Sequence, residues 1–243
     1  NALVIAISSR REVVTLYLDG RTYILQDIPT VLSKANQGLA TLEKYRSRLD
    51  RVSARLTTVE MAGAASLHDV LTVLQRSELL LRTSNEVERY IIELGSEGRL
   101  IEMQLEETAV GVLTDRAALI RDYAVDDSEA TLDAILAQLA ELPHQELLDL
   151  GRLAEVLGHD RKSNPHDLHV SARGYRALGR IPRLPRLVGE KVIHRFGSLE
   201  EILAATDHEL ADVDGVGEDR AADIREGLDR IRESEVFERY PLP

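Results

Sequence analysis

Apolar and polar positions divide the chain into a short β-type segment followed by a long helical one. Apolar runs predict three strands, at residues 2–7, 13–18 and 22–25. The last two are joined by Asp19-Gly20, a preferred two-residue hairpin turn. Three strands cannot form a sheet with both faces covered. We therefore interpret residues 1–27 as the last strands of a truncated α/β domain, with about a hundred or more residues missing upstream.

From about residue 29 onward, apolar residues recur every three or four positions, which is the spacing of an amphipathic helix. This spacing predicts a first helix of about six turns or more between Leu32 and Leu56. Two polar residues, Arg46 and Ser53, interrupt it at core-type positions. The helix is expected to end before Gly63, and to belong to a packed bundle rather than to a free coiled coil.

The same period continues beyond this break. A second apolar stripe covers residues 67–81, and a further helix is predicted to begin with Ser84 as its N-cap and to continue past Gly95 and Gly98. Three more helices complete the segment, at residues 115–123, 128–142 and 144–157. The pattern therefore predicts helices almost throughout residues 28–158.

Composition limits the class of protein. The chain has 243 residues, 44% of them hydrophobic, so it can bury a core, and two Phe with no Trp indicate that this core is aliphatic. No apolar run is long enough to cross a bilayer and no signal segment is present, so we expect a cytoplasmic protein. The absence of Cys excludes disulfides and thiolate metal sites and suits that compartment.

A short glycine pattern near the carboxyl end carries a binding mechanism. Residues 213–217 read VDGVG and precede a predicted helix. Two glycines one residue apart let the backbone turn through positive φ, so the amides of Gly215, Val216 and Gly217 can point outward. The start of the helix adds a partial positive charge at the same place. The pattern predicts a phosphate site made of backbone amides, and an ordinary tight loop is the alternative.

A degenerate copy of this pattern precedes it at residues 181–185, which read IPRLP. Its spacing matches, since Gly189 and Val192 stand where the second copy has Ala221 and Ile224. Pro185 replaces the second glycine and has no N–H, so this copy cannot offer that amide. We interpret it as a structural half that makes its contacts through arginines.

Two helix start signals lie between the copies. Ser198 and Glu201 form a capping box after the break at Gly197, which predicts a short helix through Ala205. Thr206 and Glu209 form another capping box, which predicts a short helix through Ala211.

The net charge of −12 conceals one basic block. Residues 160–199 hold nine Lys and Arg against three acids, a balance of +6, whereas the segments on either side each carry −9. Because the block coincides with the degenerate copy, its cations could supplement the amides of the second copy on a polyanion. A solvated charged face is the alternative.

Other candidate chemistry is weak. The acidic pairs Glu106-Glu107 and Asp126-Asp127 have no partnered His, and we interpret them as solvated helix ends. Three histidines lie between residues 159 and 169, but Pro165 and the polar run around them indicate a loop without fixed ligand geometry. We therefore predict no metal site.

The two copies together resemble a tandem helix-hairpin-helix domain, a module that grips DNA backbone phosphates without reading sequence. With RGYR at residues 173–176 and FGSL at 196–199, the set is similar to the C-terminal domain of the DNA integrity scanning proteins (DisA), which are bacterial diadenylate cyclases. The segment IAISSRR at residues 5–11, followed by VTLY at 14–17, looks like the end of the cyclase domain of that family.

The resemblance implies chemistry that this chain does not complete. The family condenses two ATP into cyclic di-AMP and two diphosphates with Mg²⁺ or Mn²⁺, using Asp-Gly-Ala and Arg-His-Arg motifs, and neither motif occurs here. We therefore predict no catalytic residue and no cofactor within this chain. In the family the turn after Ile7 lies beside the nucleotide, so Ser8, Arg10 and Arg11 are candidate nucleotide contacts, with exposed loop arginines as the alternative. The resemblance also implies a homo-oligomer, which is an octamer in the family.

We predict four segments: the strands at residues 1–27, a helical spine at 28–158, a linker at 159–172 and a tandem helix-hairpin-helix domain at 173–243. The predicted activity is sequence-independent binding of branched DNA, in the cytoplasm at the nucleoid, as the DNA-sensing part of a diadenylate cyclase. The candidate phosphate contacts are Gly215, Val216, Gly217, Arg220, Arg225, Arg180, Arg183, Arg186 and Lys191. The alternatives are a helix-hairpin-helix subunit of another repair factor and a helical oligomerisation scaffold.

Overall fold

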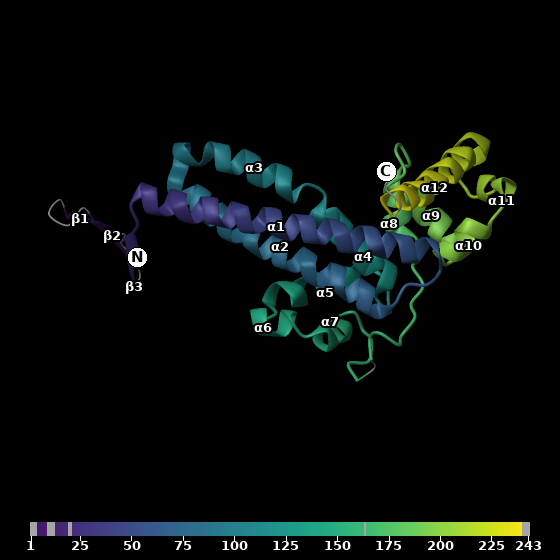
Figure 1. Ribbon diagram of the computed structural model, residues 1–243, viewed down its shortest axis with the longest axis horizontal. Helices are drawn as coiled ribbons and strands as arrows, with labels where there is room; N and C mark the ends of the chain where they lie inside the picture. Colours follow the sequence, from purple (N-terminus) through teal and green to yellow (C-terminus); the bar gives the residue numbers. More distant parts are fainter. Residues whose placement is uncertain (1–3, 9–12, 19–20, 163, 240–243) are drawn as a thin grey trace. The chain divides into compact units, whose positions relative to one another are not determined.

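The computed structural model describes residues 4–8, 13–18, 21–162 and 164–239 (Figure 1). Helices make up most of these residues, which confirms the prediction of a mainly α chain. The chain forms two compact units, the first from residues 1–46 and 80–110 and the second from residues 47–79 and 111–243. The chain passes between the units inside α1 (Ile28–Met61) and again inside α2 (Leu67–Leu94).

The first unit begins with a three-stranded sheet. β1 (Val4–Ser8), β2 (Val13–Leu18) and β3 (Arg21–Leu25) are antiparallel, in the order β1-β2-β3. Val4, Ile5 and Ile7 are all exposed, so apolar side chains on both faces of β1 have no cover from the described residues. The predicted turn Asp19-Gly20 lies outside the described residues.

The helical part of the first unit contains the first half of α1, the second half of α2, the 3₁₀ turn η1 (Gly95–Gly98) and α3 (Arg99–Ala109). Arg46, the first polar interruption of the α1 stripe, donates to the carbonyls of Thr108 and Val110 at 3.1 and 2.8 Å. The interruption therefore marks the place where the end of α3 is attached to α1.

Two predicted boundaries in this region are wrong. Ser84 does not cap a helix, because α2 continues through it and its side chain is buried. Leu80 and Val87, one turn before and after it, are fully buried, and their packing outweighs the weak preference of Ser for a helix end. The predicted continuation past Gly95 also fails. Helix α2 ends at Leu94, and Gly95 has a φ of 54°, which a right-handed helix cannot accommodate.

The second unit adds four helices to the remaining halves of α1 and α2: α4 (Val112–Tyr123), α5 (Glu129–Glu141), α6 (His144–Leu147) and α7 (Leu150–Val156). Ser128 caps α5 by accepting the Thr131 amide. The helix predicted at residues 144–157 is two helices. Asp149 interrupts it because its carboxylate accepts the amides of Gly151 and Arg152 and starts α7.

Five helices form the C-terminal part of the same unit: α8 (Tyr175–Gly179), α9 (Arg186–Phe196), α10 (Leu199–Ala204), α11 (Asp207–Ala211) and α12 (Gly217–Arg239). The capping box of Thr206 and Glu209 at the start of α11 is confirmed in both directions. Ser198 caps α10 by accepting the Glu201 amide, but among the described residues Glu201 does not return a bond to the Ser198 amide, so the second predicted capping box is formed in one direction only. One hairpin joins α8 to α9 and the other joins α11 to α12, as the two sequence copies predict.

The segment before α8 is bonded to the start of α2. The amides of Leu67 and His68 donate to the carbonyls of Leu168 and Pro165, and the rings of His68 and His166 stack with centroids 3.8 Å apart. This part of the predicted linker is therefore attached to the bundle.

Candidate nucleic-acid interface

The second hairpin adopts the predicted glycine turn. Gly215 and Gly217 have φ values of 87° and 65°. Val213 and Val216 are buried and anchor the turn, whereas both glycines are exposed. The turn therefore presents backbone to solvent.

Part of the predicted amide site is already used by the protein. The Val216 amide donates to the Val213 carbonyl at 2.9 Å, so it closes the turn instead of facing a ligand. In the described part of the chain the amides of Gly215 and Gly217 have no protein acceptor. Gly217 also begins α12, whose 23 residues add a partial positive charge at this end. Two amides, rather than three, are available to an anion.

The charges around this turn are mixed. Arg220 donates from Nη1 to the Gly215 carbonyl at 2.6 Å, which holds its guanidinium at the turn. Glu218 and Asp219, in the first turn of α12, are exposed and would repel an anion. An anion here would therefore depend on the direction of the amides and on Arg220, and not on a strongly positive surface.

The first hairpin forms the same turn without glycine. Arg183 has a φ of 63° and is the one non-glycine residue with positive φ among the described residues. The Leu184 amide donates to the Ile181 carbonyl at 3.4 Å, matching the Val216 to Val213 bond of the second hairpin. A left-handed conformation costs a residue with a Cβ about 1–2 kcal/mol. The exposed Arg183 side chain thus occupies a strained position at the tip of the hairpin.

The helices after the two hairpins carry their small residues at equivalent buried positions, Gly189 and Ala221. The two copies also contact each other. Gly227 of α12 lies against Ile181 of the first hairpin, where a Cβ would come within 2.9 Å of Ile181 Cγ1. The close approach at Gly227 packs α12 against the first hairpin.

Two of the predicted cationic contacts point toward the helical bundle. Arg180 donates to Thr57 Oγ1 of α1 at 2.8 Å. Arg186 bonds Glu190 Oε1 on its own helix at 2.9 Å and Glu129 Oε1 on α5 at 2.8 Å. Their role as phosphate contacts stays a prediction, and the structure gives both of them protein partners.

Two more predicted contacts connect elements of the C-terminal part. Lys191 Nζ lies 2.5 Å from Asp214 Oδ2 and so joins α9 to the second hairpin. Arg225 is only partly exposed and donates to the carbonyls of Leu203 and Ala205 and to Asp207. Arg225 therefore closes the end of α10, and these bonds occupy three of the five N–H donors of its guanidinium.

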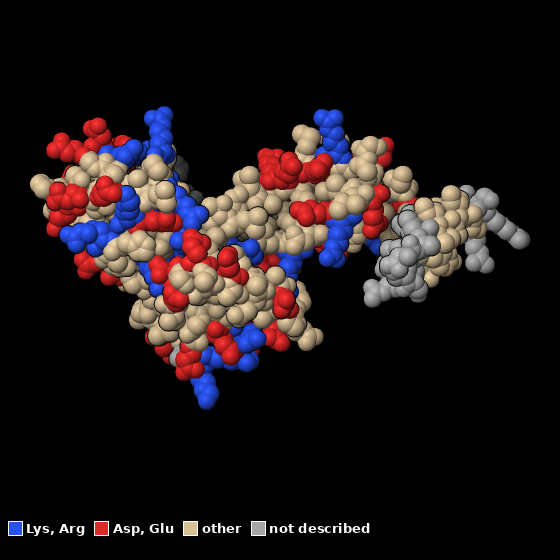
Figure 2. Space-filling view, turned by 180° about the vertical axis from the view of Figure 1, so that it is seen from behind, with Lys and Arg blue, Asp and Glu red and all other residues tan. Residues whose placement is uncertain are grey.

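Most cations of the basic block are thus engaged in contacts with the protein. They include Arg173, which donates to the Arg121, Asp122 and Val125 carbonyls, and Arg161, which pairs with Asp149. On the face drawn in Figure 2, Lys and Arg are interspersed with Asp and Glu. The charge excess in the sequence therefore does not translate into a uniformly basic surface on this face.

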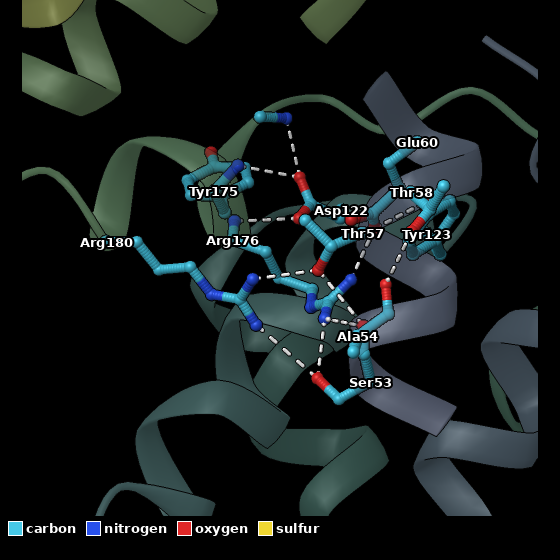
Figure 3. A network of polar contacts seen from close by, with 11 residues as sticks. Ser53, Ala54, Thr57, Thr58, Glu60, Asp122, Tyr123, Tyr175, Arg176 and Arg180 are labelled. Carbon is cyan, nitrogen blue, oxygen red and sulfur yellow. Dashed lines mark hydrogen bonds and ion pairs between the residues drawn. The ribbon is translucent and has the colours of Figure 1, made fainter. Parts of the chain in front are cut away.

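A buried polar joint attaches the first hairpin to the bundle (Figure 3). Asp122 of α4 accepts three consecutive amides at the start of α8: those of Gly174 and Tyr175 at 2.6 and 2.7 Å, and that of Arg176 at 2.8 Å. Burial, and then the nearby Glu60 carboxylate, raise the pKa of Asp122 to about 6, although the three amide bonds act in the opposite direction. Asp122 thus satisfies the free end of α8 from another helix.

The same joint contains a buried ion pair. Arg176 Nη1 lies 2.6 Å from Glu60 Oε1, and the Tyr123 hydroxyl donates to the same oxygen at 2.7 Å. Arg176 also donates to Ser53 Oγ, the second polar interruption of the α1 stripe. The polar Ser53 in an apolar stripe and the RGYR segment, which ends at Arg176, were the two sequence features that fall on this joint. Glu60 and Asp122 gave no sequence signal, because an acid in a helix normally faces solvent.

Comparison with known proteins agrees with this architecture. Residues 25–165 match the family described as the DisA bacterial checkpoint controller linker region. The chain belongs to the DisA family. It is 49% identical, over 98% of its length, to the DNA integrity scanning protein DisA of Symbiobacterium thermophilum, and 43% identical, also over 98%, to that of Frankia alni. The chain spans 66% of the length of each of these DisA relatives.

The described residues show little about the remaining predicted sites. Ser8 ends β1 and is partly exposed, whereas Arg10 and Arg11 lie outside the described residues, so a nucleotide contact there stays a prediction. Within the described ranges, no three His, Cys, Asp or Glu side chains come together as a metal site would require. None of the described helices has the length and apolar character of a membrane span.

Proposed function

We propose that this chain binds DNA through backbone phosphates, without reading sequence, and favours branched DNA that meets both hairpins at once. As part of a DisA protein, it would report DNA structure to a diadenylate cyclase that makes cyclic di-AMP from two ATP. The observation that supports this proposal best is the equivalence of the two turns, because Arg183 keeps a strained backbone at the position of Gly215. Strained backbone positions cluster at functional sites, which supports a binding role for this turn.

The proposed mechanism differs between the hairpins. At the second, one phosphate would accept the amides of Gly215 and Gly217 at the start of α12, with Arg220 beside it. At the first, Arg183 would reach the neighbouring backbone as a side chain, because Pro185 has no amide to offer.

The other predicted cations differ in how directly they would contact phosphate. Arg186 and Lys191 are exposed by 70% and 49% and would join after leaving their carboxylate partners. Arg180 and Arg225 mainly hold the hairpins in place, through their bonds to α1 and to the end of α10. DNA affinity should therefore depend most on Arg183 and Arg220.

Fluorescence anisotropy with a four-way junction and a linear duplex, at two salt concentrations, tests the proposal. We expect the junction to bind more tightly, and the logarithm of its affinity to fall with the logarithm of salt at about −0.9 per neutralised phosphate. Changing the base sequence should have little effect, since the contacts are to phosphates. If the junction is not bound even at low salt, the proposal fails and the scaffold alternative is favoured.

A further inference from the structure

Four charged side chains form a closed ring between α9 and the helical bundle. Glu129 Oε1 of α5 lies 2.9 Å from Arg121 Nη2 and 2.8 Å from Arg186 Nη2. Glu190 Oε1 of α9 lies 2.7 Å from Arg121 Nη1 and 2.9 Å from Arg186 Nε. Each carboxylate bridges both guanidinium groups, and each guanidinium bridges both carboxylates. The ring therefore connects α9 to α4 and α5 by two separate bridges.

This ring lies at a half-open cleft of about 310 Å³, which is lined by α4, α5, α8 and α9. The lining is mainly apolar and includes Leu132, Leu184 and Ile193. Within the cleft, α9 lacks the close packing against α4 and α5 that a filled core would give, and the charged bridges connect these helices there.

The two halves of the ring differ in accessibility. Arg121 and Glu190 are only 12% and 19% exposed, and Arg121 also lies over the Tyr175 ring, 4.4 Å from its centroid. Arg186 and Glu129 are 70% and 60% exposed. Its hydrogen bond to Glu190 raises the pKa of Arg186, so it stays charged. Arg186 and Glu129 can therefore separate and become solvated while Arg121 and Glu190 stay paired.

We propose that the ring is a phosphate-sensitive clasp, in which a DNA phosphate that binds Arg186 displaces Glu129 and loosens α9 from α5. This inference rests on the proposed function. An exposed ion pair contributes little to stability, and a guanidinium binds phosphate in the same bidentate geometry as carboxylate. Arg121 and Glu190 keep α9 tethered after the exchange. DNA binding and docking of α9 are then linked, and each weakens the other by the same factor.

The variant Glu129→Gln tests the clasp in the complete chain, because it removes the competing charge and leaves the helix intact. We expect its junction affinity to rise about two- to fivefold, the size of one exposed ion pair. In the Arg186→Ala background, the same change should have no effect on affinity. Asp133→Asn, on the same helix and outside the ring, is the matched control and should leave affinity unchanged.

Each other outcome contradicts a definite part of the argument. An equal gain with and without Arg186, or the same gain from Asp133→Asn, would mean simple charge repulsion and would overturn the clasp alone. An unchanged affinity of Glu129→Gln, with normal junction binding by the parent chain, would overturn it too. A parent chain that binds no junction would overturn the proposed function, and the clasp with it.

Discussion

Arg183 and Gly215 occupy the same position in two equivalent turns, with φ values of 63° and 87°. The same hydrogen bond closes both turns. The Leu184 amide donates to the Ile181 carbonyl in the first turn, and the Val216 amide donates to the Val213 carbonyl in the second. The repeat is thus preserved in backbone geometry even where its glycines are lost.

The strain at Arg183 predicts opposite effects on stability and binding. Arg183→Gly should leave the fold as stable as the parent, or more stable by up to about 1 kcal/mol, because relief of the left-handed strain exceeds the entropy cost of glycine. Its affinity for a junction should nevertheless fall. Urea unfolding and anisotropy measure the two effects. Arg48→Ala, an exposed substitution on α1, controls for the loss of one positive charge.

The open space beside Gly217 predicts a steric test of the amide site. A Cβ at Gly217 would meet no atom within 4 Å beyond its chain neighbours and the nearby backbone of α12, so Gly217→Ala would add a methyl group beside the proposed phosphate site. We expect weaker junction binding and a stability loss of about 1–2 kcal/mol from its positive φ. Gly111, with a φ of 76° and equally open space, provides the control. If Gly111→Ala weakens binding as much, the effect is one of stability.

The pair formed by Lys191 and Asp214 predicts a gain of affinity. Asp214 is 89% exposed, and its hydrogen bond to Lys191 lowers its pKa, so it is charged beside the proposed phosphate site. Asp214→Asn should therefore strengthen junction binding at low salt and change stability by less than about 1 kcal/mol. Glu43→Gln on α1, another exposed acid, should have no such effect. A reduced affinity of Asp214→Asn would mean that Asp214 shapes the turn.

The buried carboxylate of Asp122 predicts a pH dependence of stability. Its pKa in the folded protein is about 6, above the 3.8 of an ordinary Asp, so the folded state binds the proton more tightly. Its contribution to stability is therefore largest below about pH 4 and falls as the pH rises toward 6, by at most about 3 kcal/mol.

The comparison with Asp122→Asn isolates this contribution, since the variant cannot titrate. The stability advantage of the parent over the variant, measured by urea unfolding, should be smaller at pH 7 than at pH 4.5. An advantage that grows toward pH 7 would show that the three amides keep the carboxylate ionised. At every pH the variant leaves the buried Arg176 amide without an acceptor, which costs about 1–3 kcal/mol.

Local signals in the sequence predicted much of the local structure. The capping box at Thr206, the helix start at Ser198 and the glycine turn at Gly215 are all confirmed, because each depends on residues within one turn of the chain. The predictions failed where burial, rather than local preference, determined the position of a helix end. Ser84 has a local preference for a helix end, but it lies in a buried stripe that continues on both sides.

The amino-acid sequence by itself determined that this chain is mainly helical and that its carboxyl-terminal part repeats one hairpin twice, since periodicity and turn chemistry are local properties. Only the tertiary structure decided the roles of the charges. Arg176, Arg180 and Arg186 lie within ten positions of one another in the basic block, yet each forms a hydrogen bond with a residue more than fifty positions away. The energy of a charge depends on its burial and on the neighbours that folding brings to it, and a linear sequence contains neither.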